Sequence, residues 1–323
     1  MSGKDGTAAS VAGAATDGAA TDSAATDSAA AVGPRLLAGG AIAAEIRAGL
    51  AQDFAAFNER WGYAPTLAVV LVGADAPSAV YLQQILRTCE KVGAHGRLVE
   101  LSSDVMPDAL CDEIENLNAD PSVSGIIVQM PLPAHIPLRT VIDSIDQAKD
   151  IDGIHPRNAG LLTLGYDGFL PATAQASVEI LKRSGIEITG KRVVVVGRSN
   201  VVGKPAAMLL MREHGTVTVL HSRTRDLARH TSDAEILIVA AGKHGLITGE
   251  MLSQGVVVVD VGINVVPNGQ GAERLVGDVD FESARDVVSA ITPVPGGVGP
   301  LTNALLLTHL LRAATDQAEQ AAG

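Results

Sequence analysis

The stretch VVVVGRSNVVGKP, which runs from Val193 to Pro205, decides the fold of this chain. Four consecutive valines are typical of a strand that is buried on both faces of a parallel sheet. Gly197 then predicts a tight turn, and Pro205 is tolerated in the first turn of a helix. A strand, a glycine turn and a helix start in this order predict a Rossmann-like unit, which offers N–H groups to a pyrophosphate.

As a dinucleotide-binding motif, however, the stretch is incomplete. The pattern GxGxxG would place glycines at 199 and 202, where the chain has Ser199 and Val202. A Walker-type phosphate loop fits less well, because Gly203 and Lys204 come one residue too late and Pro205 replaces Ser or Thr. An ordinary strand–helix turn therefore stays open as an alternative for this segment taken alone.

The end of the next predicted strand indicates which cofactor is bound. NAD enzymes place an acidic residue there for the ribose hydroxyls, whereas this chain has His221, Ser222 and Arg223. Together with Arg198 in the preceding turn, these groups fit the additional phosphate of NADP, which arginine can bind bidentately. A solvated basic loop is the alternative, but the two segments together favour NADP.

Outward from this unit, the chain alternates helical periodicity with short apolar runs. This order predicts an α/β fold with two lobes, each built on a parallel sheet covered by helices. Between about residues 131 and 191 we expect mostly loops. The predicted helices are 41–61, 77–92, 107–118, 204–214 and 300–314, and the predicted strands are 66–72, 97–101, 125–129, 192–196, 216–220, 235–240, 256–261 and 288–291.

Composition excludes several classes of protein. The 323 residues are enough for two domains, and 47% of them are hydrophobic. Aromatic residues make up only 2% and the net charge is −12, which argues against nucleic acid as a partner. No apolar run is long enough to predict a membrane span. Cys89 and Cys111 alone cannot form a disulfide framework or a four-thiolate metal site, so we expect a cytoplasmic protein with no metal.

The first 33 residues differ from the rest. They repeat the units ATDGA and ATDSA and contain no large apolar residue between 14 and 30. Burial could not offset the entropy lost on ordering such a segment. We expect residues 1–33 to form a disordered, low-complexity tail with no catalytic role.

Five segments occur in an order that resembles one family. They are VQMPLP at 128–133, KDIDGIHPRNAG at 149–160, GRSNVVGKP at 197–205, DVGIN at 260–264 and TPVPGGVGP at 292–300. Together they are similar to the methylenetetrahydrofolate dehydrogenase/methenyltetrahydrofolate cyclohydrolase family, and the similarity covers the chain from about Leu36 to Arg312. The proline- and glycine-rich segment near the end is the most specific of the five.

The resemblance implies a domain arrangement and an activity. A folate-binding catalytic domain comprises residues 34–155 and 299–323, and a Rossmann-like NADP domain, 156–298, is inserted between these parts. The expected reaction is the NADP-dependent oxidation of 5,10-methylenetetrahydrofolate to 5,10-methenyltetrahydrofolate in one-carbon metabolism. The expected partners are a tetrahydrofolate-type substrate and a second copy of the chain, since members of the family usually form homodimers.

The resemblance also implies roles for individual residues. Tyr81 packs on the folate, Ser78 lies nearby, Gln129 orients the catalytic group, and Asp152 binds the pterin donors. From the residues alone, Tyr81 could equally be a core residue and Asp152 a turn residue. Further substrate contacts come from Pro295, Gly296 and Gly297, and cofactor contacts from Gly197, Arg198, Ser199, His221, Ser222 and Ile263.

One departure from the family motif bears on catalysis. The family has a lysine four residues after the tyrosine, on the same helix face, whereas this chain has Ile85. Arg87 and Lys91 lie on other faces of the helix. We therefore expect the cyclohydrolase step to be weak or absent. A full bifunctional enzyme, a catalytically silent folate- and NADP-binding paralogue and a reductase of another pterin-like substrate remain alternatives.

A second departure lies at residues 171–176, PATAQA, where the family has a further proline and a glycine. We expect these residues to form a loop that helps to shape the folate site. The identity of the pterin substrate is therefore open as well.

Overall fold

The computed structural model describes residues 33–323, apart from 74–75 and 268–272. The side chains of 76–81 and of Gln84 also lie outside this description. Ser78 and Tyr81 are therefore placed only as backbone positions of a helix. The predicted tail lies outside the described residues up to Val32.

The first sheet has three parallel strands in the order β3 (His95–Leu101), β2 (Thr66–Val72) and β4 (Val123–Val128). Alternate residues of the central strand β2 face opposite sides. Its odd-numbered apolar residues pack against α2 (Ala76–Val92), and its even-numbered ones against α3 (Pro107–Ala119). Both faces are thus buried, which explains why the strand is apolar throughout.

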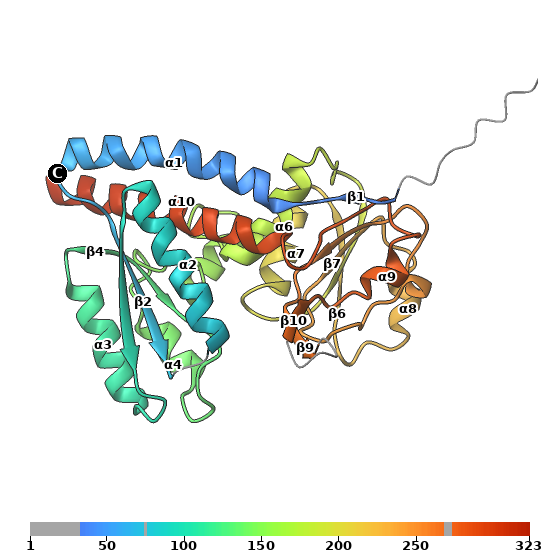
Figure 1. The fold of residues 1–323 in the computed structure, drawn as a ribbon, viewed down its shortest axis with the longest axis horizontal. Helices are drawn as coiled ribbons and strands as arrows, with labels where there is room; N and C mark the ends of the chain where they lie inside the picture. The colour runs from blue at the N-terminus through green and yellow to red at the C-terminus, as the bar shows by residue number, and fades with distance from the viewer. Residues whose placement is uncertain (1–32, 74–75, 268–272) are drawn as a thin grey trace, which may run out of the picture. The chain divides into compact units, whose positions relative to one another are not determined.

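The second sheet has six parallel strands (Figure 1). Val193 and Val195 of its strand β5 pack with α7 (Gly203–Arg212), and Val194 and Val196 pack in the cluster on the other face. The prediction of two parallel sheets in an α/β fold is confirmed. The strand order is β1 (Arg35–Leu36), β11 (Ala290–Ile291), β8 (Val257–Asp260), β7 (Ile236–Val239), β5 (Arg192–Val196) and β6 (Thr216–Leu220).

Two long helices connect these sheets. α1 (Gly39–Trp61) and α10 (Val298–Ala322) pack side by side, in blue and red in Figure 1. α10 also packs against α6 (Ala172–Arg183), which in turn packs against α7. Because β1 pairs with β11, the described part of the chain begins in the six-stranded sheet, and α1 then leads to the three-stranded one.

The prediction of a mostly loop-forming segment between about 131 and 191 is wrong. The structure has three helices there, α4 (Leu138–Ser144), α5 (Pro156–Leu164) and α6, and the predicted loop at 171–176 is the first turn of α6. Alanine favours helix but gives little apolar periodicity, so this helix start is difficult to detect in the sequence. The remaining elements that the sequence did not predict are β1 (Arg35–Leu36), α8 (Leu227–Thr231), a 3-10 helix (Gly249–Met251), β9 (Asn264–Pro267), β10 (Glu273–Val276) and α9 (Phe281–Ala284).

Among the helices that the structure describes, none combines the length and the apolar character that a bilayer crossing requires.

Candidate functional site

Gln129 and Asp152 come together at the carboxyl end of the three-stranded sheet. The backbone N–H of Gln129, the residue after β4, donates to the Val70 carbonyl at 2.8 Å. A parallel bridge between Ile126 and Asp150 brings the following turn alongside β4. Because the two segments run parallel, Gln129, three residues after Ile126, and Asp152, in the turn after Asp150, lie at the edge where α/β sheets bind ligands.

The Asp152 turn fits closely against the start of α6. The Ala172 N–H donates to the Asp152 carbonyl at 3.3 Å, and Gly153 has a φ of 69°. A Cβ on Gly153 would collide with the backbone of Leu170 and Pro171. Glycine is therefore required here both by its backbone conformation and by the close approach of the two segments.

The Asp152 carboxylate has no hydrogen-bond donor among the described residues, although the side chain is half-buried. Burial and, to a lesser extent, the negative charge of Asp150 raise its pKa to about 7. A desolvated carboxylate without donors is costly. It is suited to accept hydrogen bonds from a ligand.

Asp150 is fully buried and well satisfied, and sequence reasoning missed it. Its Oδ2 accepts from the His155 N–H at 2.8 Å and from Asn158 Nδ2 at 2.7 Å. Its Oδ1 accepts from the Ile154 N–H at 3.1 Å. Burial nevertheless raises the pKa of Asp150, against the effect of these hydrogen bonds. The signal in the sequence was the spacing of two aspartates in DIDG, which we assigned to one functional residue only.

Lys149 anchors the same segment from the other side. Its Nζ donates to three carbonyl oxygens at the end of α3, those of Leu117 at 3.1 Å, Asn118 at 2.7 Å and Asp120 at 2.7 Å. Burial lowers the pKa of this ammonium group. A cation at a helix C-terminus interacts favourably with the helix dipole, so Lys149 fixes the start of the turn.

His309 of α10 holds the middle of the turn and was not predicted either. Its Nδ1 lies 2.8 Å from the Ile151 carbonyl oxygen, which can only accept, so the ring nitrogen donates. Burial, and to a lesser extent the charge of Arg312, lower the pKa of His309 to about 4. The ring is therefore a neutral donor at physiological pH. A histidine in an otherwise apolar helix was the only signal of this role.

The predicted turn at Pro295–Gly297 lies at the start of α10. Gly296 has a φ of 109°, which favours glycine, and its carbonyl accepts from the Gly39 N–H at 3.0 Å. A Cβ on Gly297 would collide with Thr292 and with the Pro293 carbonyl. The turn is thus tied to the first residue of α1.

Ile85 is 3% exposed and belongs to an apolar cluster. It shares that cluster with Phe54, Leu82, Cys89 and Ile151. Burial of such a side chain stabilises the fold by roughly 1.5–3 kcal/mol. Ile85 is therefore part of the hydrophobic core.

At the second sheet, Gly197 follows β5 with a φ of 133°. Its N–H donates to the Leu220 carbonyl of β6 at 2.9 Å, and a Cβ would collide with the Ala240 carbonyl. Glycine therefore allows three neighbouring strand ends to meet closely, as the phosphate-binding turn of a Rossmann unit requires.

The side chain and carbonyl of Ser199 bind the N–H groups at the start of α7. Ser199 Oγ accepts from the N–H groups of Val202 at 3.0 Å and Gly203 at 3.3 Å, and the Ser199 carbonyl accepts from Lys204 at 3.1 Å. Ser199 therefore satisfies the first turn of α7. The N–H groups of residues 198–201 have no partner among the described residues and can still bind a phosphate.

The other predicted cofactor residues lie at the same sheet edge. Arg198 and Ser222 are exposed and follow the paired strands β5 and β6. The His221 N–H donates to Thr224 Oγ1 at 2.9 Å, which fixes the turn that carries Ser222. Ile263, 67% exposed, follows β8. The unpaired backbone donors, the glycine turn and these basic and hydroxyl groups fit a dinucleotide with an additional phosphate.

Two buried carboxylates shape this edge, and the sequence did not reveal them. Asp260, at the end of β8, is 4% exposed, and Asp278 is fully buried. Asp278 accepts from Ala241 N at 2.6 Å, Gly242 N at 2.8 Å, Lys243 N at 2.8 Å and Asn264 Nδ2 at 2.9 Å. Asp260 accepts from Gly262 N at 2.9 Å, Asp278 N at 3.0 Å and Val279 N at 2.9 Å.

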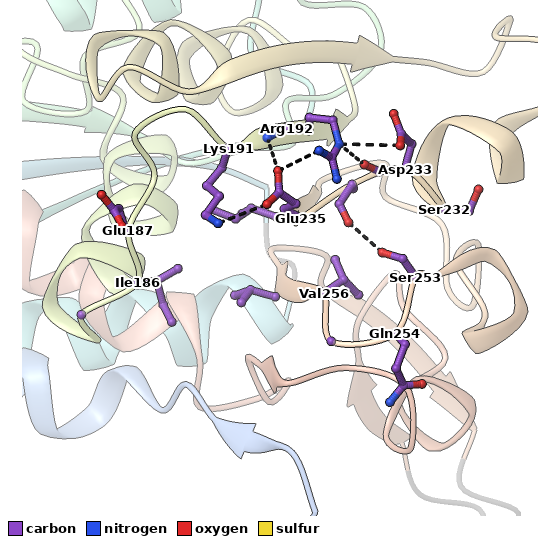
Figure 2. A pocket seen from close by; sticks show the side chains of 15 residues that line it. Ile186, Glu187, Lys191, Arg192, Ser232, Asp233, Glu235, Ser253, Gln254 and Val256 are labelled. Carbon is purple, nitrogen blue, oxygen red and sulfur yellow. Dashed lines mark hydrogen bonds and ion pairs between the residues drawn. The ribbon is translucent and has the colours of Figure 1, made fainter.

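A pocket at the opposite edge of this sheet differs in character (Figure 2). It lies where β5, β7 and β8 begin, and its charged side chains bind one another. Lys191 and Arg192 both pair with Glu235, at 3.1 Å and 3.3 Å. Arg192 Nε also donates to the Asp233 carbonyl at 2.9 Å. Its two cations are already paired with acidic side chains, and it lies at the opposite edge from the glycine turn, so this pocket is not the predicted cofactor site.

Comparisons with known proteins agree with this arrangement. The family model of the tetrahydrofolate dehydrogenase/cyclohydrolase catalytic domain matches residues 37–152, and that of the NAD(P)-binding domain matches residues 171–318. A protein of Moorella thermoacetica named bifunctional protein FolD is 49% identical over 280 residues, which cover 87% of this chain and 98% of that protein.

Two solved structures are also similar. The bifunctional FolD dehydrogenase/cyclohydrolase of Campylobacter jejuni has a TM-score of 0.82 and 42% identity, over 87% of this chain and 98% of that one. The methylenetetrahydrofolate dehydrogenase-cyclohydrolase of Trypanosoma brucei, complexed with NADP and an inhibitor, has a TM-score of 0.84 and 37% identity, over 88% and 98%. The predicted family, enzyme class and nicotinamide-dinucleotide cofactor are confirmed. The chain belongs to the tetrahydrofolate dehydrogenase/cyclohydrolase family.

Proposed function

We propose that the protein oxidises 5,10-methylenetetrahydrofolate to 5,10-methenyltetrahydrofolate with NADP, and that its cyclohydrolase activity is weak or absent. The family assignment supports the dehydrogenase step. Asp152 is the proposed acceptor for the pterin donors, and Gln129 lies at the same sheet edge. Tyr81 and Ser78 are proposed substrate contacts from α2, and Pro295–Gly297 are proposed contacts from the start of α10.

The observation that carries the proposal is the burial of Ile85 among apolar side chains. NADP, when bound, accepts a hydride from the methylene carbon, and that step requires no proton transfer by the protein. Hydrolysis of the resulting cation adds water and opens a ring, which calls for a positioned acid or base. Isoleucine cannot provide one, and the loss of such a group typically costs about 10²–10⁴-fold in rate.

The full bifunctional enzyme is the second candidate, and one observation favours it. The pKa of Asp152 is raised to about 7, so this carboxyl group exchanges protons near neutral pH. It could then supply part of the proton transfer that the lysine provides in the family motif. The rate at which methenyltetrahydrofolate decays distinguishes the two candidates.

The test is a spectrophotometric assay of the purified protein with methylenetetrahydrofolate and NADP. We expect methenyltetrahydrofolate to accumulate and to decay at its spontaneous rate. Ile85→Lys should restore part of the hydrolysis, whereas Ile85→Met, which fills similar space without an amine, should not. Recovery is expected to be partial, because a lysine placed in an apolar cluster must be solvated or paired. Hydrolysis at enzymatic rates by the unmutated protein would favour the bifunctional candidate.

The cofactor preference gives a separate test. Arg198 and Ser222 occupy the position where an acidic residue marks NAD enzymes, so NADP should bind at least about tenfold more tightly than NAD. Arg198→Ala should remove most of this preference. Arg192→Ala, at the opposite end of the same strand, is the matched control and should not change it. Calorimetric titration with both cofactors measures the difference, and equal affinities in the unmutated protein would contradict the assignment.

We also propose the domain division expected from the sequence, with a folate domain of 34–155 and 299–323, an NADP domain of 156–298 and a tail that takes no part in catalysis. A cytoplasmic homodimer joined through the NADP domains is part of this proposal. The exposed apolar residues Val265 and Leu275 on the β9–β10 hairpin support such an interface.

A further inference from the structure

The turn that carries Asp152 is built around the side chain of Asp150. Three donors converge on the Asp150 carboxylate, and two of them, the N–H groups of Ile154 and His155, belong to the turn itself. The third, Asn158 Nδ2, comes from the first turns of α5. Both Asp150 and Asn158 are completely buried. The Asp150 carboxylate therefore links both ends of the turn of residues 150–155, and Asp152 lies between these ends.

We propose that Asp150 is a positioning residue of the folate site, which fixes the turn of residues 150–155 and sets the protonation of Asp152. It does not touch the ligand in this scheme, but acts through Asp152. The inference rests on the proposed role of Asp152 as the acceptor for the pterin donors. It goes further in assigning a second carboxylate, which controls how strongly the first can bind.

After burial, the negative charge of Asp150 is the main influence on the pKa of Asp152, since the cations of this region have other partners. Lys149 directs its Nζ away to the carbonyls at the end of α3. His309, from α10, is a neutral donor to Ile151. Arg312, also from α10, pairs with Asp167 at 2.7 Å. Among the described residues, no lysine or arginine forms an ion pair with either carboxylate.

His155 is the remaining titratable group near the pair, and it acts on Asp150. Its Nδ1 accepts from the Arg157 N–H at 3.1 Å, and its positive form lowers the pKa of Asp150. The three hydrogen bonds to Asp150 also favour its ionised form. The charge of Asp150 is thus stabilised by three hydrogen bonds, whereas Asp152 has no donors of its own among the described residues.

Protonation of Asp152 would weaken folate binding. An ionised carboxylate only accepts hydrogen bonds, which suits a ligand edge that only donates, whereas the protonated group brings a donor of its own. Because burial and Asp150 raise the pKa of Asp152 to about 7, affinity should fall as the pH drops through neutrality. Removing the charge of Asp150 should lower the pKa of Asp152 and move this loss to lower pH.

The test is the pH dependence of tetrahydrofolate binding by the full-length protein, measured calorimetrically with NADP present. Asp150→Asn should weaken binding at high pH severalfold, because one of the three donors then faces an amide. It should also shift the midpoint of the acid loss by roughly one pH unit downwards. Asp146→Asn, an exposed aspartate of the same segment, is the matched control and should change neither quantity.

Asp152→Asn separates this inference from the proposed function. If it leaves tetrahydrofolate binding and its pH profile unchanged, Asp152 is not the pterin acceptor, and the proposed role fails. If Asp152→Asn weakens binding but Asp150→Asn leaves the midpoint unmoved, Asp150 is only structural and the inference is overturned. A purely structural residue would lower the affinity at every pH without moving the midpoint.

Asn158→Ala covers the case in which Asp150→Asn does not fold. It keeps the Asp150 charge and removes one donor to it. We expect weaker tetrahydrofolate binding, with NADP affinity preserved as evidence that the cofactor site is intact. Unchanged tetrahydrofolate affinity in this variant would overturn the positioning role.

Discussion

Each sheet has a pair of buried or half-buried carboxylates beside it, and the two pairs differ in how their oxygens are satisfied. At the six-stranded sheet, Asp260 accepts from backbone N–H groups only, and Asp278 accepts from backbone N–H groups and from the Asn264 amide. At the three-stranded sheet, Asp150 is satisfied in the same way. Asp152 is not, since no described residue donates to it.

The difference separates carboxylates that build a site from a carboxylate that is left for a ligand. Buried polar groups are almost always hydrogen-bonded, and a buried acceptor that lacks partners usually has a functional reason. Burial raises the pKa of Asp260 only to about 6, because three backbone N–H groups stabilise its charge. Asp152 reaches about 7 with no such support. Replacing one of the hydrogen-bonded carboxylates, Asp150, Asp260 or Asp278, should therefore affect folding, whereas replacing Asp152 should affect ligand binding.

The largest effect on stability is expected for Asp278→Asn. Asparagine keeps only one of the two carboxylate oxygens and has an NH₂ group in place of the other. Two of the four donors would therefore face that NH₂ group. We expect a loss of about 2–4 kcal/mol in the free energy of unfolding, measured by urea denaturation near pH 8. Asp152→Asn is the matched comparison and should be neutral or slightly stabilising at that pH, because it removes an unsatisfied charge. Equal losses in the two variants would contradict the distinction.

The second prediction concerns His309, whose ring nitrogen donates a hydrogen bond to the Ile151 carbonyl in the Asp152 turn. His309 has a folded pKa of about 4, below its ordinary value of 6.5, so the fold favours the neutral ring. Its contribution to stability is complete above pH 6.5 and is lost as the pH falls towards 4. His309→Gln keeps a donor for the Ile151 carbonyl but does not titrate. The stability difference between the two proteins should therefore change by about 3 kcal/mol across this range.

Urea unfolding at several pH values measures this difference. Asp152 and Asp260 have raised pKa values, so they stabilise the fold below the unfolded value near 3.8 and lose that contribution as the pH rises to 6 or 7. Their effect has the opposite sign, but it is present in both proteins and cancels in the comparison. His230→Gln, on the exposed side of α8, is the control. A difference that is independent of pH would mean that His309 is not held neutral.

Regular elements with a clear apolar pattern could be predicted from the sequence. Strands 66–72, 192–196 and 216–220 were predicted with the observed bounds, because continuous β-branched runs between turns have few other interpretations. The helix at the end of the chain was predicted to stop at 314 but continues to Ala322, since nothing in its alanine-rich end breaks a helix. Gly197 and the position of Ile85 in a helix were also found from the pattern alone.

The residues that the sequence did not reveal share a physical cause. Asp150, Asp278 and His309 act through partners that are distant in the sequence or belong to irregular backbone. Tertiary contacts of this kind leave no periodicity. Ser199 is a related case on the cofactor side, where a predicted ligand contact also accepts hydrogen bonds from the start of α7.

The smallest expected effect concerns a second buried acceptor. Gln175 Oε1, near the start of α6, has no hydrogen-bond partner in the part of the chain that the structure describes. If no ligand binds to this oxygen, its burial costs free energy that no hydrogen bond offsets. Gln175→Leu, which has a similar volume, should then stabilise the fold by about 1 kcal/mol. Gln317→Leu is the matched control and should destabilise it, because Gln317 Nε2 donates to the Ser124 carbonyl at 2.8 Å. Denaturant titration gives both values. A loss of tetrahydrofolate or NADP affinity in Gln175→Leu would instead place this oxygen with Asp152, as an acceptor kept free for a ligand.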